Sequence, residues 1–551
     1  MHREQAKRML VVWVAGAALL AMLGPIGCST RKPLPNTFHL PSTGVSAKNQ
    51  ALLLAIDDIL LPVRSNLNYY LSKPQVLKQP VLTPRVGNPK APDQIAAFFY
   101  GSVLNEGGKY RMWYYPLHIA YGQNLNSFDE FPFREGPVCY AESADGIRWT
   151  RPDLEQVEFA GSRANNAISL PDDRIMGVHV IKDEDDSDPQ RRYKMVYNIY
   201  GRTSLIRTAT SPDGIRWHPS PGASADSGSG DPRSHFIETS SFYRFSGLYV
   251  VHGQRSTRSE GGHDEGRQGR ACISGDFAEW LPGHADAFLI TEPADPSARG
   301  DTKPYDQVHL GVGGAAFGNV VVGLYGLWHN SPGKPSKLPD SWFGFNKTSG
   351  DLGLVISNDG LHFREPVKGY VYLSRHDSPA TPLPGRDYPT ILCQSGNGIL
   401  NVGDQTLIYH GRWRNSHYGR DYWSEVALAT LPRDRWGALG LYPEGSRDSA
   451  PEGWVWSAPV TLPETGCDLK LNADHANQMR VEVTDEHFRP LPQYSGAKSG
   501  RTETESGLDC PVAWPEAQLS ALGGRTVRFR TYLKRDAGKE PRLYALSLKS
   551  S

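Results

Sequence analysis

Ser143-Ala144-Asp145-Gly146-Ile147-Arg148-Trp149 is repeated with a single change at 211–217. Looser copies of the same phrase follow at 274–280 and 357–363. The copies recur at intervals of roughly 60 to 85 residues, which is longer than a solenoid repeat and long enough for one four-stranded sheet with generous loops. The repeat therefore predicts a β-propeller.

The residues before each copy also favour β-structure. A run rich in Tyr, Val, Trp and Met stands there, in most cases after a glycine turn, as at 108–114 and 318–325. Such side chains suit half-buried pleated sheets, and Asp-Gly supplies the positive backbone angles of a tight hairpin. A fifth run at 403–409 begins like the others. We therefore predict an all-β fold in which residues 47–442 form a five-bladed β-propeller.

A different periodicity begins after the fifth repeat. Residues 443–453 are rich in Pro, Gly, Ser and charged side chains, as a domain boundary often is. The runs 479–483 and 527–533 then alternate between apolar and polar residues, which is typical of strands with one buried face. The sequence predicts a small C-terminal β-sandwich over 454–551.

Residues 1–28 have the features of an export signal. A basic start is followed by an apolar run at 9–23, which is short for a bilayer span, and then by small residues. The stretch ending at Cys28 resembles the signal of bacterial lipoproteins, which implies lipidation of Cys28 and tethering to a bacterial cell envelope. A plain signal peptide and an uncleaved anchor are the alternatives. Residues 29–46 are predicted to be a polar tether.

The charge balance narrows the class of partner. The chain contains 59 Lys and Arg and 59 Asp and Glu, so no net field favours nucleic acid or an anionic membrane surface. The spacing of His and Cys matches no zinc site, and no Gly-x-Ser-x-Gly elbow occurs. We expect a monomer with no cofactor and no catalytic metal. The acidic run 183–188 is a candidate for structural calcium, with a solvated loop as the competing interpretation.

The cysteines after the export signal are not expected to be catalytic. Cys139, Cys272 and Cys393 fall in or beside predicted strands, where a small apolar side chain is readily buried. Cys467 and Cys510 share the C-terminal segment and could form a disulfide in an oxidising compartment, a pairing that sequence alone does not fix.

The repeats, the strand at 109–114 and the trailing sandwich resemble the superfamily of five-bladed propeller glycoside hydrolases, which includes invertases, levanases and arabinanases. More narrowly, the chain is similar to uncharacterised bacterial proteins described as glycosyl hydrolase family 32-like. The resemblance covers nearly the whole mature chain and implies hydrolysis of glycosidic bonds. The chain lacks the Asn-Asp-Pro-Asn-Gly signature of invertases, which counts against invertase activity.

Cleaving a glycosidic bond needs one carboxylic acid that protonates the leaving oxygen and one carboxylate that attacks the sugar or activates water. In a propeller, the first residues of every inner strand meet at the mouth of a central funnel. Acids near these positions, or at departures from the repeat, are therefore the catalytic candidates: Asp231, Asp306, Asp58, Asp93, Glu142 and Glu238. Asp231 comes first, because a glycine-rich approach precedes it and His235 follows. For Asp58 and Asp93, a structural turn and a solvated loop are the competing interpretations.

Amide, guanidinium and aromatic side chains are suited to holding sugar hydroxyls, acidic groups and ring faces. The candidates for substrate binding are Asn165, Asn166, His235, Asp387, Arg412 and Trp413. The acids that recur at the hairpin turns are predicted instead to cap those turns through the backbone. We exclude these from catalysis: Asp145, Asp213, Asp276 and Asp359.

We expect an exo-acting glycoside hydrolase that cleaves a plant or algal poly- or oligosaccharide. A non-catalytic carbohydrate-binding propeller of the bacterial envelope is the main alternative. A scaffold in a surface complex is a third, and it would have an open channel lined by apolar or uniformly charged residues. Two carboxylates that meet across the funnel would favour the enzyme.

Overall fold

The structure is a computed structural model. It describes residues 35–119, 133–172, 174–199, 205–220, 237–258, 264–281, 285–288, 308–329, 349–414, 422–536 and 538–551. The chain divides into two compact units, Met1–Pro35 and Asn36–Ser551, and almost everything described belongs to the second.

The predicted all-β class is confirmed. Within the described ranges, every helix is a short 3-10 turn, and none is long and apolar enough to cross a membrane. These turns are η1 (Pro189–Arg191), η4 (Gly396–Gly398), η5 (Ala476–Gln478), η6 (Gly496–Lys498) and η7 (Leu519–Leu522).

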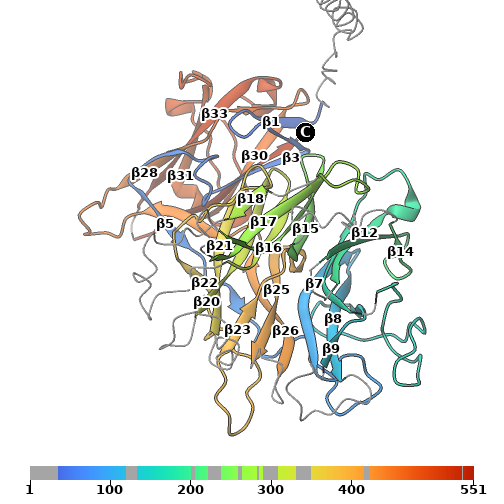
Figure 1. Cartoon of the computed structure of the whole chain (residues 1–551). Helices are drawn as coiled ribbons and strands as arrows, with labels where there is room; N and C mark the ends of the chain where they lie inside the picture. Colours follow the sequence, from blue (N-terminus) through green and yellow to red (C-terminus); the bar gives the residue numbers. More distant parts are fainter. Residues whose placement is uncertain are drawn as a thin grey trace, which may run out of the picture. The chain divides into compact units, whose positions relative to one another are not determined.

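Antiparallel units of four or five strands follow one another along the chain (Figure 1). The first unit contains β7 (Ala96–Glu106), β8 (Lys109–Ile119), β9 (Phe133–Glu135) and β10 (Cys139–Ser143). The second contains β11 (Ile175–Lys182), β12 (Tyr193–Ile199), β13 (Leu205–Ser211) and β14 (His218–Pro219). The third contains β15 (Glu238–Phe245), β16 (Leu248–Arg258), β17 (Asp264–Ser274) and β18 (Ala285–Phe288).

Two further units share one continuous sheet, joined by the single parallel pair Gly350 and Ile391. One contains β19 (Val308–Phe317), β20 (Val320–His329), β21 (Ser349–Ser357) and β22 (Val371–Leu373). The last contains β23 (Thr390–Cys393), β24 (Ile399–Val402), β25 (Gln405–Arg414), β26 (Trp423–Pro432) and, from the N-terminal part of the chain, β6 (Gln75–Val76). The pairing of β6 with β26 therefore ties the beginning of the repeat region to its end.

The repeated Asp-Gly phrases form the hairpin turns, as predicted. In the first copy, Asp145 Oδ1 accepts from the backbone N–H groups of Ile147 and Arg148 at 2.9 and 2.8 Å. These hydrogen bonds hold the pKa of the Asp145 carboxyl below its usual range. The equivalent carboxylates of the other copies cap their turns in the same way: Asp213, Asp276 and Asp359. Their exclusion from catalysis is therefore supported by a structural role.

The turn glycines also connect neighbouring units. An aromatic side chain of the preceding unit donates to the glycine carbonyl in three cases: Trp113 to Gly214 at 2.9 Å, Tyr243 to Gly360 at 2.6 Å and Tyr409 to Gly146 at 2.8 Å. Tyr409 belongs to the last unit and Gly146 to the first. This contact therefore links the two ends of the repeat region a second time.

Two further antiparallel sheets contain the C-terminal strands. The first contains β1 (Thr37–Leu40), β2 (Val45–Lys48), β4 (Val63–Ser65), β28 (Glu452–Trp456), β29 (Val460–Thr461), β31 (Met479–Asp485) and β33 (Thr526–Lys534). The second contains β3 (Gln50–Leu54), β5 (Leu67–Leu71), β27 (Gly437–Leu441), β30 (Cys467–Asp474), β32 (Gly507–Pro511) and β34 (Arg542–Ser550). Their buried faces share one hydrophobic cluster, to which Phe38, Leu53 and Phe529 belong.

Both sheets thus combine the two ends of the chain, and Figure 1 shows the blue strands β1 and β3 beside the orange and red strands β30 and β33. The predicted boundaries do not separate these sheets from the rest of the chain: β1 lies within the predicted tether 29–46, and β3, β4, β5 and β27 lie within the predicted propeller segment 47–442. Pairing between strands that lie far apart in the sequence produces no local periodicity, so the sequence pattern does not predict it.

Cys467 and Cys510 are buried, free thiols. Cys510 lies opposite Leu471 of β30, whereas Cys467 lies opposite Ser550 of β34, so the two are not cross-strand neighbours. The disulfide considered from the sequence is therefore not formed in the structure. The other three described cysteines are buried, as expected for small apolar side chains: Cys139, Cys272 and Cys393.

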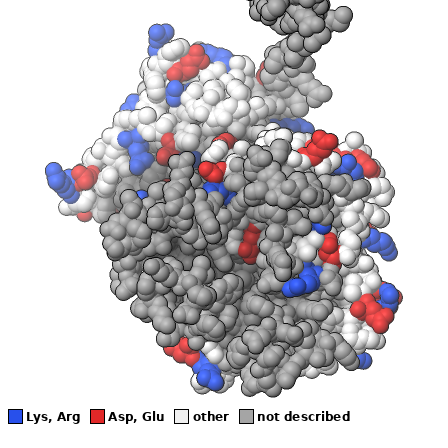
Figure 2. Space-filling view, in the orientation of Figure 1, with Lys and Arg blue, Asp and Glu red and all other residues white. Residues whose placement is uncertain are grey.

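Charged side chains of both signs are interspersed among the coloured residues of the face shown in Figure 2. This distribution is consistent with the equal numbers of acidic and basic residues in the sequence.

Candidate functional site

The inner strands of successive units meet around η4. β7, β11, β15 and β19 contact one another in chain order, and η4 touches all four. A side chain at Gly396 would overlap the carbonyl of Gly314, and one at Gly398 would lie 2.5 Å from the ring of Phe99. Glycine is therefore required where η4 packs into the centre.

Polar side chains fix this plug. The side chain of Asn397 donates to Phe242 O at 2.7 Å and to Val180 O at 3.2 Å, and accepts from Phe242 N at 2.8 Å. Ser395 donates to Gly101 O at 2.6 Å. η4 thus fills the described centre between the inner strands and is held there by hydrogen bonds.

Each of the four inner strands changes register in its first half. The irregularities fall at Phe98/Ser102, Met176/Val178, Thr239/Ser241 and His309/Val312. Bulges at equivalent positions bend the strands where they approach η4 and re-aim the side chains before the bend. η4 contacts these strands at or beyond the bulges, through Gly101, Val180, Phe242 and Gly314, so the first residues of the four strands lie on one side of η4, which we call the entrance.

Glu238 is the first residue of β15 and is half-buried at this entrance. Its carboxylate accepts a hydrogen bond from Gln254, its cross-strand partner on β16. Burial raises the pKa of Tyr100 on β7, and the charge of Glu238 contributes to the same direction. The Glu238 carboxylate is therefore within electrostatic range of a side chain from the first unit.

Asp172 lies three residues before β11, the inner strand of the neighbouring unit. Its Oδ2 accepts from the hydroxyl of Tyr197 at 2.9 Å. Burial and the charge of Asp172 raise the pKa of Tyr197, while Arg207 opposes this shift. Sequence reasoning considered only the asparagines of this unit and missed Asp172, although the rule that selected Asp93, an acid just before an inner strand, also applies to it.

Strands of the first and last units supply an aromatic wall on the same side. Phe98 stacks on Tyr115 with ring centroids 4.7 Å apart, and Trp413 packs edge-on against Phe98 and Tyr100 at 5.2 and 5.4 Å. Tyr422 meets Phe98 at 5.6 Å. Trp413, predicted as a sugar platform, is thus a buried member of this wall with 9% of its surface exposed.

Asp93 is fully buried in a cluster of donors. Arg85 Nε lies 2.6 Å from Asp93 Oδ1, while Tyr114 Oη and Arg151 Nε lie 2.8 and 2.9 Å from Oδ2. A carboxylate satisfied by two guanidinium groups ties the segment before β7 to the first unit. The solvated-loop interpretation is therefore wrong.

Asp58, a catalytic candidate from the sequence, is the exposed member of an acidic pair, and its neighbour Asp57 is the buried one. Asp57 is fully buried, while 60% of the Asp58 side chain is exposed. The chain turns at this point, so that Asp57 caps the backbone N–H groups of Ile59 and Leu60 and pairs with Arg364 at 2.7 Å. Burial raises the pKa of Asp57 although Arg364 opposes it.

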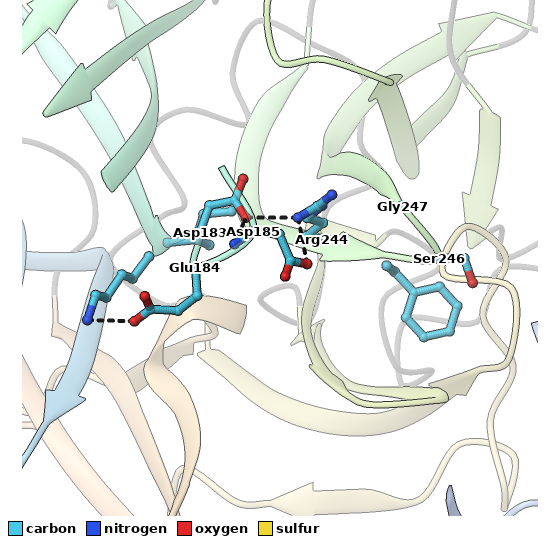
Figure 3. A pocket seen from close by; sticks show the side chains of 9 residues that line it. Asp183, Glu184, Asp185, Arg244, Ser246 and Gly247 are labelled. Carbon is cyan, nitrogen blue, oxygen red and sulfur yellow. Dashed lines mark hydrogen bonds and ion pairs between the residues drawn. The ribbon is translucent and has the colours of Figure 1, made fainter. Parts of the chain in front are cut away.

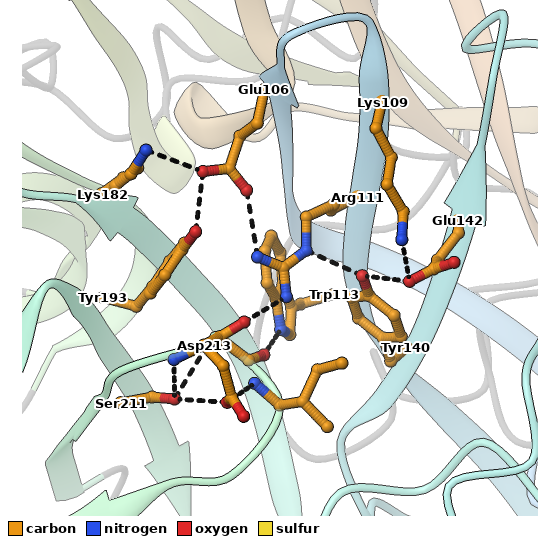
Figure 4. A network of polar contacts seen from close by, with 12 residues as sticks. Glu106, Lys109, Arg111, Trp113, Tyr140, Glu142, Lys182, Tyr193, Ser211 and Asp213 are labelled. Carbon is orange, nitrogen blue, oxygen red and sulfur yellow. Dashed lines mark hydrogen bonds and ion pairs between the residues drawn. The ribbon is translucent and has the colours of Figure 1, made fainter. Parts of the chain in front are cut away.

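Glu142 belongs to a polar network beside the hairpin between β7 and β8 (Figure 4). Lys109 Nζ lies 2.7 Å from Glu142 Oε1, which also accepts from Tyr140 at 2.9 Å. Burial alone would raise the pKa of Glu142, but these partners outweigh it and lower the pKa. In the same network Arg111 donates to Glu106, Tyr140 and the carbonyl of Asp213. Glu142 therefore lies at the opposite end of the inner strand from the entrance.

Two asparagines predicted to bind substrate form hydrogen bonds inside the protein instead. Asn165 is 1% exposed and donates to Val157 O and Ser162 O. Asn166 is fully buried and donates to Tyr114 Oη and Tyr140 O at 3.0 and 2.8 Å. The two side chains brace the first unit, which explains the asparagine pair.

Arg412 is likewise internal, with 1% of its surface exposed. It donates to Ser378 Oγ at 2.7 Å and to Leu77 O at 2.9 Å, and lies 3.7 Å from the buried Glu425. The alternation of β25 turns Arg412 into the sheet interface, and the solvent-exposed role considered for it is wrong. Asp387 is exposed on the loop between β22 and β23.

Four predicted functional residues lie outside the described residues: Cys28, Asp231, His235 and Asp306. Among the described ranges, no group of three or more His, Cys, Asp or Glu side chains could hold a metal ion.

The acidic run considered for calcium lines a pocket with Ile181, Arg244 and 245–247 (Figure 3). Its carboxylates are neutralised by cations of the protein. Asp183 pairs with Lys194 at 3.2 Å and with Arg244 at 2.9 Å, and Lys194 also pairs with Asp186 at 2.6 Å. Asp183 is thus buried and ion-paired, whereas Glu184, Asp185 and Asp188 are exposed, so most of the run is a solvated turn, the favoured interpretation.

Comparisons with known proteins give distant similarities. No family model matches the chain. An uncharacterised protein of Mycobacterium tuberculosis, found in two strains, is 31% identical over 118 residues, which are 21% of this chain and 32% of the relative. The chain thus matches about a third of the length of these curated relatives.

Solved structures similar to the chain are those of carbohydrate-active enzymes, the class that the repeats resemble. A glycosyl hydrolase of Bacteroides ovatus is 14% identical, with a TM-score of 0.41, over 67% of this chain and 94% of that one. The β-1,2-mannobiose phosphorylase of Listeria innocua is 12% identical, with a TM-score of 0.40, over 66% and 97%. The family 32 β-fructofuranosidase of Bombyx mori is 12% identical, with a TM-score of 0.31, over 84% and 94%.

Proposed function

We propose that this chain is a glycoside hydrolase whose active site lies at the entrance formed by the inner strands. The observation that carries the proposal is the placement of two carboxylates, Asp172 and Glu238, at the beginnings of neighbouring inner strands. Asn198 connects these strands, because it lies opposite Met176 of β11 and donates to Ile237 O at 2.9 Å. A pair of carboxylates facing one sugar is what general acid–base cleavage of a glycosidic bond requires.

The architecture that we propose is a five-bladed β-propeller with a β-sandwich built from both ends of the chain. The successive antiparallel units, the inner strands around η4 and the contacts between the last and first units support the propeller. The hydrophobic cluster between the two remaining sheets supports the sandwich.

We further propose exo-action on a plant or algal poly- or oligosaccharide. The support for exo-action is the closed centre: an entrance blocked below by η4 accommodates the end of a glycan more readily than the middle of one. The aromatic wall around Phe98 and Trp413 offers apolar rings beside this entrance. The choice of a plant or algal glycan rests on the resemblance of the repeats to propeller glycoside hydrolases.

The proposal is tested by measuring sugar release from a panel of plant and algal polysaccharides with the purified full chain. Glu238→Gln and Asp172→Asn should each lower the rate by about 100-fold or more, since loss of a general acid or base typically costs that much. Asp231→Asn and Asp306→Asn are tested beside them. Asp468→Asn, which removes an exposed carboxylate of β30, is the matched control and should leave the rate unchanged.

If added azide restores the rate of a variant, the anomeric configuration of the glycosyl azide formed would distinguish the nucleophile of a retaining mechanism from its acid–base residue. Activity that survives both Glu238→Gln and Asp172→Asn would overturn the proposed site. A folded wild type that retains a glycan on an affinity gel but releases no sugar would establish the alternative, a carbohydrate-binding propeller without catalysis.

We also propose that the chain is exported and tethered through Cys28 to a bacterial cell envelope as a lipoprotein. The basic, apolar and small-residue order of 1–28 supports this. Metabolic labelling with a fatty acid should mark the wild-type chain but not Cys28→Ser, and fractionation should move that variant out of the membrane fraction. A labelled Cys28→Ser chain would contradict lipidation at this residue.

A further inference from the structure

The seven-stranded sheet has one face that no other described sheet covers. Along β33, Val527, Phe529 and Leu533 enter the hydrophobic cluster, so Arg528 and Arg530 project from the opposite face. On β28, Val455 is likewise buried while both tryptophans lie on the outer side. The outer surface, defined here as the aromatic–arginine face, consists of Trp454, Trp456, Phe488, Arg528, Arg530 and Tyr532.

Arg530 is enclosed by aromatic rings. Its guanidinium carbon lies 4.5 Å from the ring centroid of Trp454, 5.2 Å from Trp456 and 4.5 Å from Tyr532. Rings at these distances attract a cation and exclude part of its hydration. The side chain is therefore held in place before any ligand arrives.

The carboxylate opposite Arg530 already accepts hydrogen bonds from other groups. Glu482 is its cross-strand neighbour, but Glu482 accepts from Arg480 at 3.1 Å, from Tyr532 Oη at 2.9 Å and from Gly496 N at 3.1 Å. Within the described part of the chain, Arg530 forms no ion pair, and its Nε atom is buried without a hydrogen-bond partner. A buried donor of this kind costs free energy until an acceptor satisfies it.

A second cation stands two residues away on the same face. Among the described residues, Arg528 donates to the backbone carbonyls Glu486 O at 2.9 Å and Ser457 O at 3.2 Å. Its guanidinium carbon lies 4.2 Å above the ring of Phe488, which is 46% exposed and packs edge-on against Trp456 at 5.1 Å. Phe488 adopts a positive φ of 66°, an uncommon conformation for a bulky side chain and a frequent mark of functional loops.

We propose that the aromatic–arginine face binds an acidic polysaccharide, with a uronate carboxylate on Arg530 and sugar rings against Trp456 and Phe488. A planar carboxylate matches the donor fork of a guanidinium, and the apolar face of a sugar packs on an aromatic ring. An anionic bilayer fits less well, because Glu452 and Glu482 lie among the cations rather than leaving a uniformly basic cluster. The surface belongs to β28, β33 and the turn that follows β31, not to the strands of the proposed catalytic entrance.

The test measures binding of the purified full chain to three probes: polygalacturonate, the same polymer with its carboxylates methyl-esterified, and phosphatidylserine-containing vesicles. Polygalacturonate should bind, the esterified polymer should bind at least about tenfold more weakly, and raised salt should weaken binding. Arg530→Gln should lower the affinity for polygalacturonate about tenfold. Arg501→Gln, at an exposed position paired through its backbone with Ala513, is the control and should bind as the wild type does.

Phe488→Ala provides a second variant, since this exposed ring can be removed without opening the hydrophobic cluster; it should weaken binding several-fold while the melting temperature stays unchanged. Equal binding of the esterified polymer, unchanged binding by both variants, or binding only to vesicles would each overturn the proposal. Because the readout is binding, the result does not depend on whether the entrance at Glu238 is catalytic.

Discussion

At the scale of single residues, a glycine of the repeated turns is required both by its backbone angle and by its packing. Gly146 has a φ of +74°, and a side chain there would place Cβ 2.5 Å from the hydroxyl of Tyr409. Gly161 has a φ of +75° but nothing within 4 Å of the same position. Both glycines adopt a left-handed backbone conformation, but only Gly146 is also packed against another unit. Comparing substitutions at the two positions therefore distinguishes backbone strain from close packing.

Gly146→Ala should destabilise the protein more than Gly161→Ala does. Both variants bear the cost of a left-handed Ala, about 1 kcal/mol, while Gly146→Ala adds an overpacking cost of about 1–3 kcal/mol. Chemical denaturation followed by circular dichroism measures the difference. Equal losses of unfolding free energy in the two variants would show that the Tyr409 side chain moves aside without cost and that its contact with Gly146 does not hold the units together.

A buried histidine supplies a pH prediction at the same scale. Burial lowers the pKa of His252 to about 4, from an ordinary value of 6.5; its ring stacks on Tyr243 and meets Gly360 O at 3.3 Å. Asp359 works to raise this pKa, and His362 to lower it.

Since the unfolded chain takes up a proton below pH 6.5 and the folded chain only near pH 4, His252 should make the free energy of unfolding fall as pH drops through this window. The slope from one such group is about 1.4 kcal/mol per pH unit. In His252→Gln the slope of the free energy of unfolding against pH between pH 6.5 and pH 4 should be smaller than in the wild type by about this amount, measured by denaturation at a series of pH values. An unchanged slope would contradict the assignment of a neutral His252.

The sequence predicted residue roles best where the backbone alone determines them. The turn-capping acids such as Asp145 follow from local hydrogen bonds and are confirmed. Asp57 and Arg412 owe their burial to Arg364 and Ser378, which are distant in sequence. No local pattern signals such partners, so the sequence predicted neither the burial of Asp57 nor that of Arg412.

At the scale of elements, η4 organises the inner strands. Asn397 joins η4 to β15 through Phe242 and to β11 through Val180, so one side chain connects three elements. A sequence pattern predicts the strands because their periodicity is local. It does not predict η4 as a plug, since three residues of 3-10 helix carry no periodicity and the contacts come from five different strands.

Asn397→Ala should therefore cost about 2–4 kcal/mol of stability, because it leaves several buried backbone groups without partners. Asn88→Ala, which removes one exposed local hydrogen bond to Lys90 N, is the control and should cost less than about 0.5 kcal/mol. Denaturant midpoints compare the two. A loss at Asn397 no larger than the control would mean that η4 does not hold the inner strands in place.

At the scale of the whole molecule, the two ends of the chain fold together. The sequence predicted a sandwich from 454–551 because the alternation of β31, β33 and β34 is visible locally. It gave no sign that β3 would lie beside β34 from Leu54 to Gln50, or that β4 and β5 would pair with β28 and β27. Pairing between strands hundreds of residues apart depends on tertiary packing and not on local propensity.

Residues 454–551 expressed alone should consequently remain unfolded. The fragment lacks β1–β5 and β27, and with them Phe38, Leu53 and Leu439 of the shared hydrophobic cluster. Exposed edges on β28 and β34 would favour aggregation over folding. Circular dichroism and hydrogen exchange should show no cooperative transition in the fragment, while the full chain unfolds cooperatively. A folded, protease-resistant fragment would demonstrate that the C-terminal strands form an independent domain and that the N-terminal strands only attach to it.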